Sequence, residues 1–222
     1  GIHPLPENLR VSGKEVEYGF EHLALRQPIV HEGEALGWVY VMMGLEGLYA
    51  QIAVYALIKA TKGVAEALLF SLGEEIGWRG LFVPELAKVT SFTRTALISG
   101  VVWAAWHMPV ILFADYHNGS TPVAFAAVCF AVMIIGVSFP FAWLTLKSRS
   151  LWTAVLLHTT HNVFIQGFFD RLTGNGSITP YVAGEFGVGL ALTGLVTAYV
   201  FWRISQSAQA LSAKTQSVAE PV

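Results

Sequence analysis

The chain has 222 residues, of which 54% are hydrophobic and only 13% are charged, and its mean hydropathy is +0.55. Because a soluble domain usually carries about 25% charged residues, this composition argues against an ordinary water-soluble protein. The formal net charge of -2 offers no basic surface to a phosphate backbone, so nucleic-acid binding is not expected. The single cysteine, Cys129, excludes an internal disulfide and a cysteine-rich zinc site.

Residues 1–35 differ from the rest of the chain because they are polar and rich in glutamate. We interpret them as a polar cytoplasmic segment that precedes a membrane domain. The chain begins at Gly1 rather than at a methionine, which indicates a fragment or a processed form, with further spans upstream as one alternative.

Four stretches contain no Asp, Glu, Lys or Arg, namely 95–114, 116–146, 150–169 and 186–202. About 20 mainly apolar residues in a helix cross a ~30 Å hydrocarbon core, so each stretch predicts a membrane span. Two further spans, 36–58 and 64–84, carry polar interruptions. We therefore predict an all-α, polytopic membrane protein, with a bundle of about six transmembrane helices over 36–204 and a flexible tail over 205–222.

Basic residues are divided unevenly between the connections of this six-span arrangement. One side carries Arg10, Lys14, Arg26, Lys88, Arg94, Lys147, Arg149, Arg203 and Lys214, and the other carries Lys59, Lys62 and Arg171. The positive-inside rule makes the first side cytoplasmic, with both ends of the chain. Short loops and the lack of a targeting sequence favour a prokaryotic plasma membrane.

Ionisable residues inside spans are functional candidates, because a charge at mid-bilayer costs ~2.5–3.5 kcal/mol. The second span contains Glu74, Glu75 and Arg79. Glu75 and Arg79 are four residues apart and share a helix face, whereas Glu74 is rotated by about 100° from Glu75. We expect Glu75 to be the structural partner of Arg79, which leaves Glu74 for chemistry.

The third and fifth spans add histidines and an amide. His107 follows Trp103 by four residues, and His158 precedes Asn162 by the same spacing, with His161 one turn from His158. A carboxylate, imidazoles and a carboxamide together can support hydrolysis. Structural roles are the alternative: an ion pair within the second span, a packing role for His107, and an interhelical hydrogen-bond pair for His158 and Asn162.

These segments resemble the motifs of the CPBP intramembrane proteases, the Abi or CAAX-processing family that includes the Ras-converting CAAX endopeptidase. The run GEEIGWRGLFVPEL resembles the family's Glu-Glu-x-x-x-Arg motif, WAAWHMP its aromatic-x-x-x-His motif, and SLWTAVLLHTTHN its His-x-x-x-Asn motif. The sequence departs from the pattern at Trp103, where Phe is common, and at His161, which the pattern does not require. The relatives have roughly eight spans, so the predicted six fit an N-terminal truncation.

The resemblance implies an intramembrane endopeptidase that hydrolyses a peptide bond of a membrane-embedded or prenylated substrate. Glu74 would be the general base for water and His107 would help to hold it, while His158 and Asn162 would form the oxyanion hole. Glu75, Arg79, Trp103 and His161 would support them. We favour a mechanism without a cofactor; in the zinc-dependent alternative, Glu74, His107 and His158 would be the ligands.

Two further classes remain as alternatives. A non-catalytic immunity or scaffold protein would be expected to lose one of the motifs, and all three are present. A proton or ion pathway built on Glu74, Glu75, Arg79 and the histidines would be expected to show inverted repeats, and the sequence shows no such symmetry. The partners we expect are the lipid bilayer and a hydrophobic or prenylated peptide; the sequence does not select one substrate.

Overall fold

The structure is a computed structural model that describes residues 3–4, 15–18, 21–31, 34–114, 116–174 and 176–219. The chain divides into two compact units, Gly1–Lys62 and Gly63–Val222, which are described separately. Parts of the expected polar segment 1–35, including Arg10 and Lys14, lie outside the described residues. The last three residues of the expected tail 205–222 also lie outside them.

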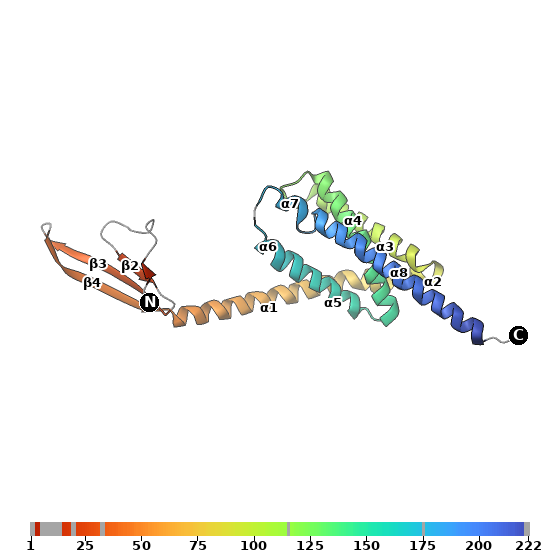
Figure 1. Cartoon of the computed structure of the whole chain (residues 1–222), viewed down its shortest axis with the longest axis horizontal. Coiled ribbons are helices and arrows are strands. Elements are labelled where there is room, and N and C mark those ends of the chain that lie inside the picture. The colour runs from red at the N-terminus through yellow and green to blue at the C-terminus, as the bar shows by residue number, and fades with distance from the viewer. Residues whose placement is uncertain are drawn as a thin grey trace. The chain divides into compact units, whose positions relative to one another are not determined.

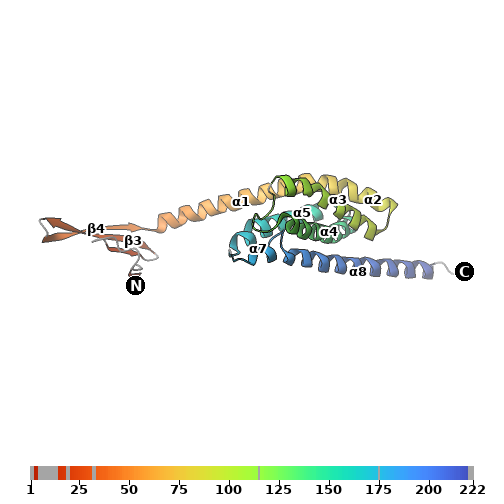
Figure 2. The same ribbon diagram turned by 90° about the horizontal axis from the view of Figure 1, so that it is seen from above.

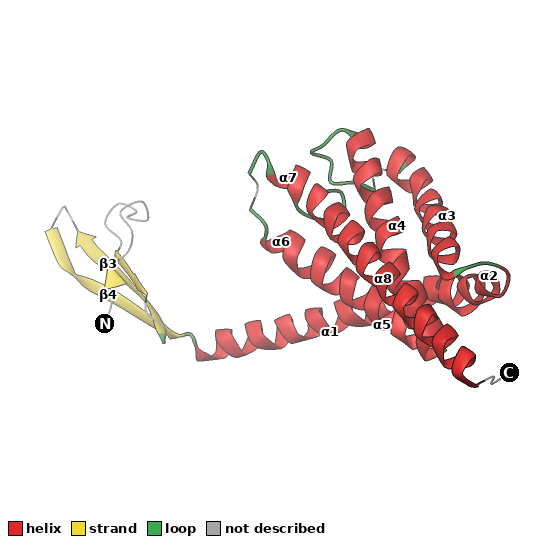
Figure 3. Ribbon diagram, turned by 45° about the vertical axis from the view of Figure 1, so that its right-hand side comes forward, coloured by secondary structure: helices red, strands yellow, loops and turns green. Residues whose placement is uncertain are grey.

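The first unit contains an antiparallel sheet with the strand order β1-β2-β3-β4, drawn in yellow in Figure 3. Its strands are β1 (His3–Pro4), β2 (Glu15–Tyr18), β3 (His22–His31) and β4 (Glu34–Gly44). Strands β3 and β4 form the longest pairing, with Leu25 opposite Val41. The predicted helical span 36–58 is therefore wrong over 36–44, where aromatic and β-branched residues favour a strand.

Helix α1 (Glu46–Gly77) begins directly after this sheet, and Glu46 lies in its first turn, where a carboxylate is favourable. The helix is continuous through residues 59–63, so the predicted spans 36–58 and 64–84 are not separated by a turn. Gly63 is a weak helix breaker, at about 1 kcal/mol relative to Ala, and no proline accompanies it. Lys59 and Lys62 therefore lie in a helix and not in a loop between two spans. The cytoplasmic placement of both ends of the chain stays a prediction.

The second unit is helical. After α1 come η2 (Trp78–Phe82), α2 (Val83–Val89), α3 (Phe92–Phe113), α4 (Val123–Ser148), α5 (Trp152–His161), η3 (Asn162–Phe169), α6 (Asp170–Leu172), α7 (Thr179–Val182) and α8 (Val188–Ala219). Within the described residues, three segments are long and apolar enough to cross a membrane: α3, α4 and Val188–Leu211 of α8. The predicted span 150–169 is instead divided between α5 and the π-helix η3.

This unit confirms the all-α, polytopic membrane fold, although the described residues contain three long apolar helices where we predicted about six spans. Figures 1 and 2 both place α8 alongside α4, and α3 also contacts α4. The α4–α8 contact is close because two glycines face each other: a Cβ added to Gly136 would lie 2.8 Å from the Cα of Gly194. Small residues are the usual means by which membrane helices approach so closely. Helix α4 thus forms the centre of the bundle.

Helix α8 extends beyond its apolar part. Its backbone is helical to Ala219, within the segment 205–222 whose flexibility stays a prediction. The segment after Arg203 is rich in Ala, Ser and Gln, and it contains no glycine or proline before Pro221. Ala and Gln have high helix propensity, so the helix can continue beyond the apolar span.

Candidate active site

A buried ion pair lies at the junction of α1 and η2. Nη1 of Arg79 donates to both carboxylate oxygens of Glu75, at 2.9 Å to Oε1 and 3.1 Å to Oε2. The Glu75 side chain is fully buried and that of Arg79 almost so. The expected pairing of residues four apart on one helix face is confirmed, and it places an internally neutralised charge pair inside the bundle.

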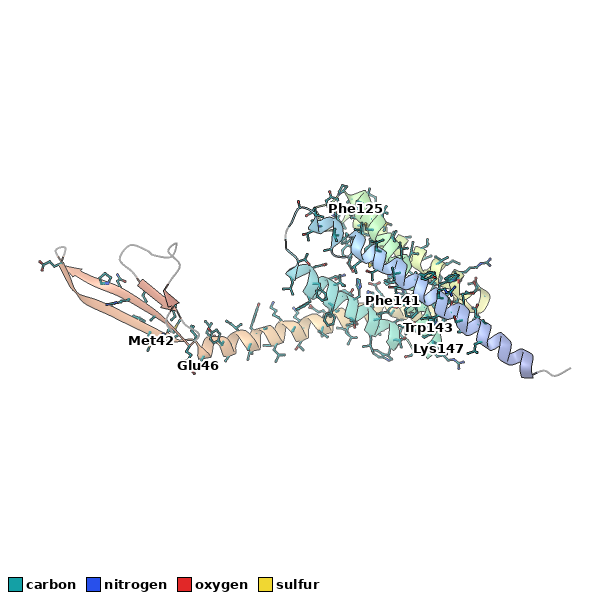
Figure 4. All side chains as sticks on the ribbon, viewed as in Figure 1. Met42, Glu46, Phe125, Phe141, Trp143 and Lys147 are labelled. Carbon is teal, nitrogen blue, oxygen red and sulfur yellow. The ribbon has the colours of Figure 1, made fainter. Side chains whose placement is uncertain are left out.

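Two aromatic rings enclose the guanidinium of Arg79. Its Cζ lies 4.0 Å from the centroid of the Trp103 ring, on α3, and 4.3 Å from that of the Phe141 ring, on α4. Figure 4 labels Phe141 between Phe125 and Lys147, and its side chain is buried. Among the described residues, Nε and Nη2 of Arg79 have no hydrogen-bond partner. Ring contacts therefore provide much of the environment of this cation.

Glu75 also binds a histidine from α5. Nδ1 of His158 lies 2.9 Å from Oε1 of Glu75, and both side chains are buried. A carboxylate can only accept, so an ionised Glu75 requires the hydrogen of His158 on Nδ1. In the neutral imidazole this leaves Nε2 as an acceptor. The first and third motifs are thus joined through Glu75, the glutamate to which we assigned a structural role.

Glu74 is joined instead to the second motif. Nε1 of Trp103 donates to Oε2 of Glu74 at 3.0 Å. One turn further along α3, Nδ1 of His107 lies 2.9 Å from the carbonyl oxygen of Trp103. That carbonyl can only accept, so His107 also carries its hydrogen on Nδ1 and has Nε2 as the acceptor in its neutral form. Trp103 therefore contacts both residues expected to bind water.

Asn162 lies where α5 changes into η3. Its Nδ2 donates to Oγ of Ser71, on α1, over a long 3.4 Å. Both π-helices begin beside motif residues, because Arg79 belongs to η2 and Asn162 is the first residue of η3. Single π-helical turns within longer helices are often found at functional sites. Sequence reasoning gave no role to Ser71 or Phe141, since neither is a titratable residue at a motif spacing.

His161 points to a different cluster from His158. Its Nε2 lies 2.8 Å from Oε1 of Glu185, in the connection that precedes α8. Nε2 of Gln166 donates to the same oxygen at 2.9 Å, and the Tyr116 hydroxyl donates to Oε2 at 3.3 Å. Sequence reasoning missed Glu185, Gln166 and Tyr116. The one feature of the sequence that could have indicated this cluster is a lone glutamate directly before the predicted span 186–202.

Electrostatics differ between the acidic groups near this second cluster. Burial would raise the pKa of Glu185, but the hydrogen bonds and charge of His161, together with Gln166 and Tyr116, outweigh it and lower that pKa. Burial and the charge of Glu185 raise the pKa of the Tyr116 hydroxyl well above its usual range. Burial and Glu185 also raise the pKa of Asp170, against the opposing charge of His161. Glu185 is thus the ionised centre of this cluster.

The predicted zinc ligands do not form a metal-binding group. In the part of the chain that the structure describes, no three His, Cys, Asp or Glu side chains are grouped so that they could hold one metal ion. Oε2 of Glu74 is hydrogen-bonded to Trp103, and Nδ1 of His158 is hydrogen-bonded to Glu75. Glu74, His107 and His158 are thus not grouped as the three ligands of one ion in this arrangement, and independence from a metal ion stays a prediction.

Trp103 contacts three of the four expected catalytic residues. Glu74 and His107 are joined through Trp103, and Trp103 also makes an edge contact with the ring of His158, with centroids 5.5 Å apart. Asn162 is connected to α1 through Ser71. All eight residues of the predicted site belong to the second unit, and three of the four supporting residues directly contact an expected catalytic residue or its partner.

Comparisons with known proteins support the family resemblance. Residues 56–164 match the type II CAAX prenyl endopeptidase Rce1-like family. A CAAX prenyl protease 2 of Methanococcus maripaludis is 26% identical over 99 residues, which cover 43% of this chain and 36% of that relative. The chain thus spans little more than a third of the relative's length. No solved structure matches the chain. The family match contains all eight residues of the predicted site but not Glu185.

Proposed function

Because the chain belongs to the Rce1-like family of type II CAAX prenyl endopeptidases, we propose that it is an intramembrane endopeptidase acting on prenylated substrates. The observation that carries this proposal is the connection of Glu74 to His107 through Trp103, inside a bundle of apolar helices. Hydrolysis at such a site requires an activated water, a proton acceptor and donors for the tetrahedral oxyanion.

Glu74 is the proposed general base. One of its oxygens accepts the indole N–H of Trp103 at 3.0 Å, which fixes the orientation of the carboxylate. Its side chain is half-buried, unlike the fully buried Glu75, so water and a substrate have access to it. The proton of the attacking water would pass to Glu74 and then to the nitrogen of the leaving peptide, as general acid–base catalysis requires.

His107 is proposed to hold the same water through Nε2. Its hydrogen bond to the Trp103 carbonyl places the hydrogen on Nδ1, so Nε2 can accept from water in the neutral ring. The ring is also held from the side by Phe130, with centroids 5.0 Å apart. A fixed imidazole acceptor beside a carboxylate is a suitable arrangement for orienting a nucleophilic water.

Asn162 and His158 are proposed to stabilise the oxyanion. The long 3.4 Å bond to Ser71 holds the Asn162 amide weakly, and the second hydrogen of its Nδ2 remains for a substrate oxygen. His158 is different, because its Nδ1 hydrogen is directed at Glu75. Nε2 of His158 can donate to an oxyanion only when the imidazole is protonated, and the Glu75 carboxylate would stabilise that charge.

The proposed substrate is a membrane-bound peptide whose C-terminus carries a prenylated cysteine followed by three residues. This class follows from the family and from the name of the methanogen relative. Apolar side chains on the outer surfaces of α3 and α8 are exposed, which suits helices in contact with lipid. A lipidated peptide would reach the site from the same environment.

Cleavage of a farnesylated peptide by purified protein in liposomes tests the proposal. Mass spectrometry should detect release of the C-terminal tripeptide, and Glu74→Ala should abolish it. Glu46→Ala, which removes an exposed carboxylate from the same helix, is the matched control. Loss of the Asn162 donor in Asn162→Ala should lower kcat by about 10²-fold. Unchanged cleavage by Glu74→Ala would overturn the role of Glu74.

We further propose that the reaction does not depend on a metal ion. This proposal is supported by the arrangement of the described His, Cys, Asp and Glu side chains, no three of which are grouped so that they could hold one metal ion. Elemental analysis of purified active protein, before and after treatment with a chelator, provides the test. Stoichiometric zinc that is lost together with activity would contradict the proposal.

A further inference from the structure

Glu185 is a buried carboxylate whose hydrogen bonds come from three other segments. Only 6% of the residue is exposed. Oε1 binds His161 of α5 at 2.8 Å and Gln166 of η3 at 2.9 Å, while Oε2 accepts the hydroxyl of Tyr116, from the α3–α4 connection, at 3.3 Å. A buried charge is costly unless it is satisfied in this way, so its retention calls for a functional explanation.

The contact with Oε1 depends on the π-helix. His161 and Gln166 are five residues apart, and in an α-helix the residues that share a face are three or four apart. In a π-helix the hydrogen bonds join residues five apart, so side chains at that spacing lie near the same face of the helix. Because η3 begins directly after His161, both side chains can reach the same oxygen of Glu185. Binding of Glu185 and the π-helical register therefore favour each other.

The π-helical register begins directly after the third motif. Asn162 is the first residue of η3, and its backbone N–H donates to the carbonyls of His158 and Thr159, so Asn162 keeps its place relative to His158. A change from π to α geometry in η3 would rotate the residues after Asn162, including Gln166, relative to His158. Tyr116 extends the cluster toward the second motif, because its ring stacks on His107 at 6.5 Å with an interplanar angle of 30°. Glu185 is thus connected to both motif-bearing segments.

We propose that Glu185 is a positioning residue for the reaction, holding Tyr116 against His107 and holding η3, which follows directly on the third motif, in its π-helical register. This inference rests on the proposed endopeptidase function. Glu185 lies in the connection between α7 and α8, outside the segment that matches the family. Glu185 itself does not contact the reacting atoms.

Kinetics of Glu185 variants test this role. Glu185→Ala should lower kcat by about 10- to 100-fold with KM within about twofold, because small displacements of catalytic groups have large effects on rate. Glu185→Gln should recover much of this loss, since its amide oxygen can still accept from His161 and Gln166. Gln166→Met removes one exposed donor and leaves the buried carboxylate in place, so it should fold and show a smaller loss in the same direction.

A matched pair of tyrosine variants separates positioning from general destabilisation. Tyr116→Phe removes a hydroxyl bound to Glu185, whereas Tyr181→Phe removes one from a ring that packs on Phe125. Only Tyr116→Phe should lower kcat. Equal kcat for wild type, Glu185→Ala and Gln166→Met, measured on the folded fraction, would overturn the proposal.

Hydrogen exchange provides a readout that does not need activity. Backbone amides of residues 162–169 should exchange faster in Glu185→Ala and in Gln166→Met than in the wild type, while those of α4 should be unchanged. Unchanged exchange in η3 would overturn the positioning role even in an active enzyme. The two proposals can fail separately. If the wild type cleaves no prenylated peptide but the variants still exchange faster in η3, the proposed function is wrong, whereas the role of Glu185 in holding the π-helical register is supported.

Discussion

The carboxylates of Glu75 and Glu185 are both buried, and each binds a histidine of α5, but the rest of their environments differ. Glu75 is neutralised by Arg79 from the next turn of the same continuous helix. Glu185 is satisfied by a tyrosine, a histidine and a glutamine from other segments. The charge of Glu75 is therefore neutralised by a local contact, whereas that of Glu185 is satisfied by tertiary contacts alone, and their variants should behave differently.

We expect the largest effect when the cation that neutralises Glu75 is removed. Arg79→Met leaves the Glu75 charge buried without its partner, which should destabilise the protein by about 3–5 kcal/mol. Lys88→Met is the control, because it breaks the exposed pair with Glu85, whose contribution should be no more than about 1 kcal/mol. Unfolding by SDS titration in mixed micelles measures both. Equal losses in the two variants would mean that Arg79 is not needed to neutralise Glu75.

Gly136→Ala should have the next largest effect without touching either cluster. The added Cβ would meet the backbone of Gly194 across the α4–α8 contact, and overpacking of this kind costs about 1–3 kcal/mol. We expect a lower unfolding midpoint but nearly unchanged kcat in the folded fraction. This variant calibrates how far destabilisation alone reduces activity. If its kcat falls as much as that of Glu185→Ala, the kinetic evidence for positioning by Glu185 loses its force.

The pH dependence of stability should distinguish Glu185 from an unperturbed carboxylate. Its folded pKa is lowered, so it contributes stability that is present above the unfolded pKa of a glutamate, about 4.3, and lost as the pH falls through the lower folded value. When the pH is lowered from neutral to below the folded pKa of Glu185, the Glu185→Gln variant should therefore lose less stability than the wild type. Parallel stability curves for the two proteins would contradict the lowered pKa.

Tyr116→Phe should have the smallest effect on stability. The 3.3 Å hydrogen bond to Glu185 is long, and a bond of this kind contributes about 0.5–1.5 kcal/mol or less. Ultraviolet titration adds a spectroscopic check, because the raised pKa keeps the Tyr116 hydroxyl protonated after ordinary tyrosines have ionised. Wild type and Tyr116→Phe should thus give the same titration amplitude up to the usual tyrosine range. A larger amplitude in the wild type there would contradict the raised pKa.

The sequence was sufficient where the relevant contact is local. Four-residue spacing on one helix predicted the pair of Glu75 and Arg79, and the charge-free stretches predicted α3, α4 and the apolar part of α8. The division between Glu74 and Glu75 also followed from rotation along a helix. The family resemblance then indicated which three segments should meet, and the contacts of Trp103 with Glu74 and of His158 with Glu75 agree with it.

The sequence was insufficient where tertiary contact or a change of helical register decides the outcome. The strand at 36–44 is apolar and adjoins a helix, so hydropathy alone could not separate the two. His161 was placed beside His158, but η3 lets it pair with Gln166 at a five-residue spacing and bind Glu185 instead. The partners of Glu185 are also distant in sequence, because Tyr116 is 69 residues away.

The most direct test of the account compares the two adjacent glutamates in one assay. Glu74→Gln and Glu75→Gln should each be purified in liposomes, and both the unfolding midpoint and the rate of tripeptide release from a farnesylated peptide should be measured. We predict that Glu74→Gln abolishes release at an unchanged midpoint, whereas Glu75→Gln lowers the midpoint. Wild-type cleavage by a folded Glu74→Gln protein would contradict the assignment of Glu74 as the base that activates water.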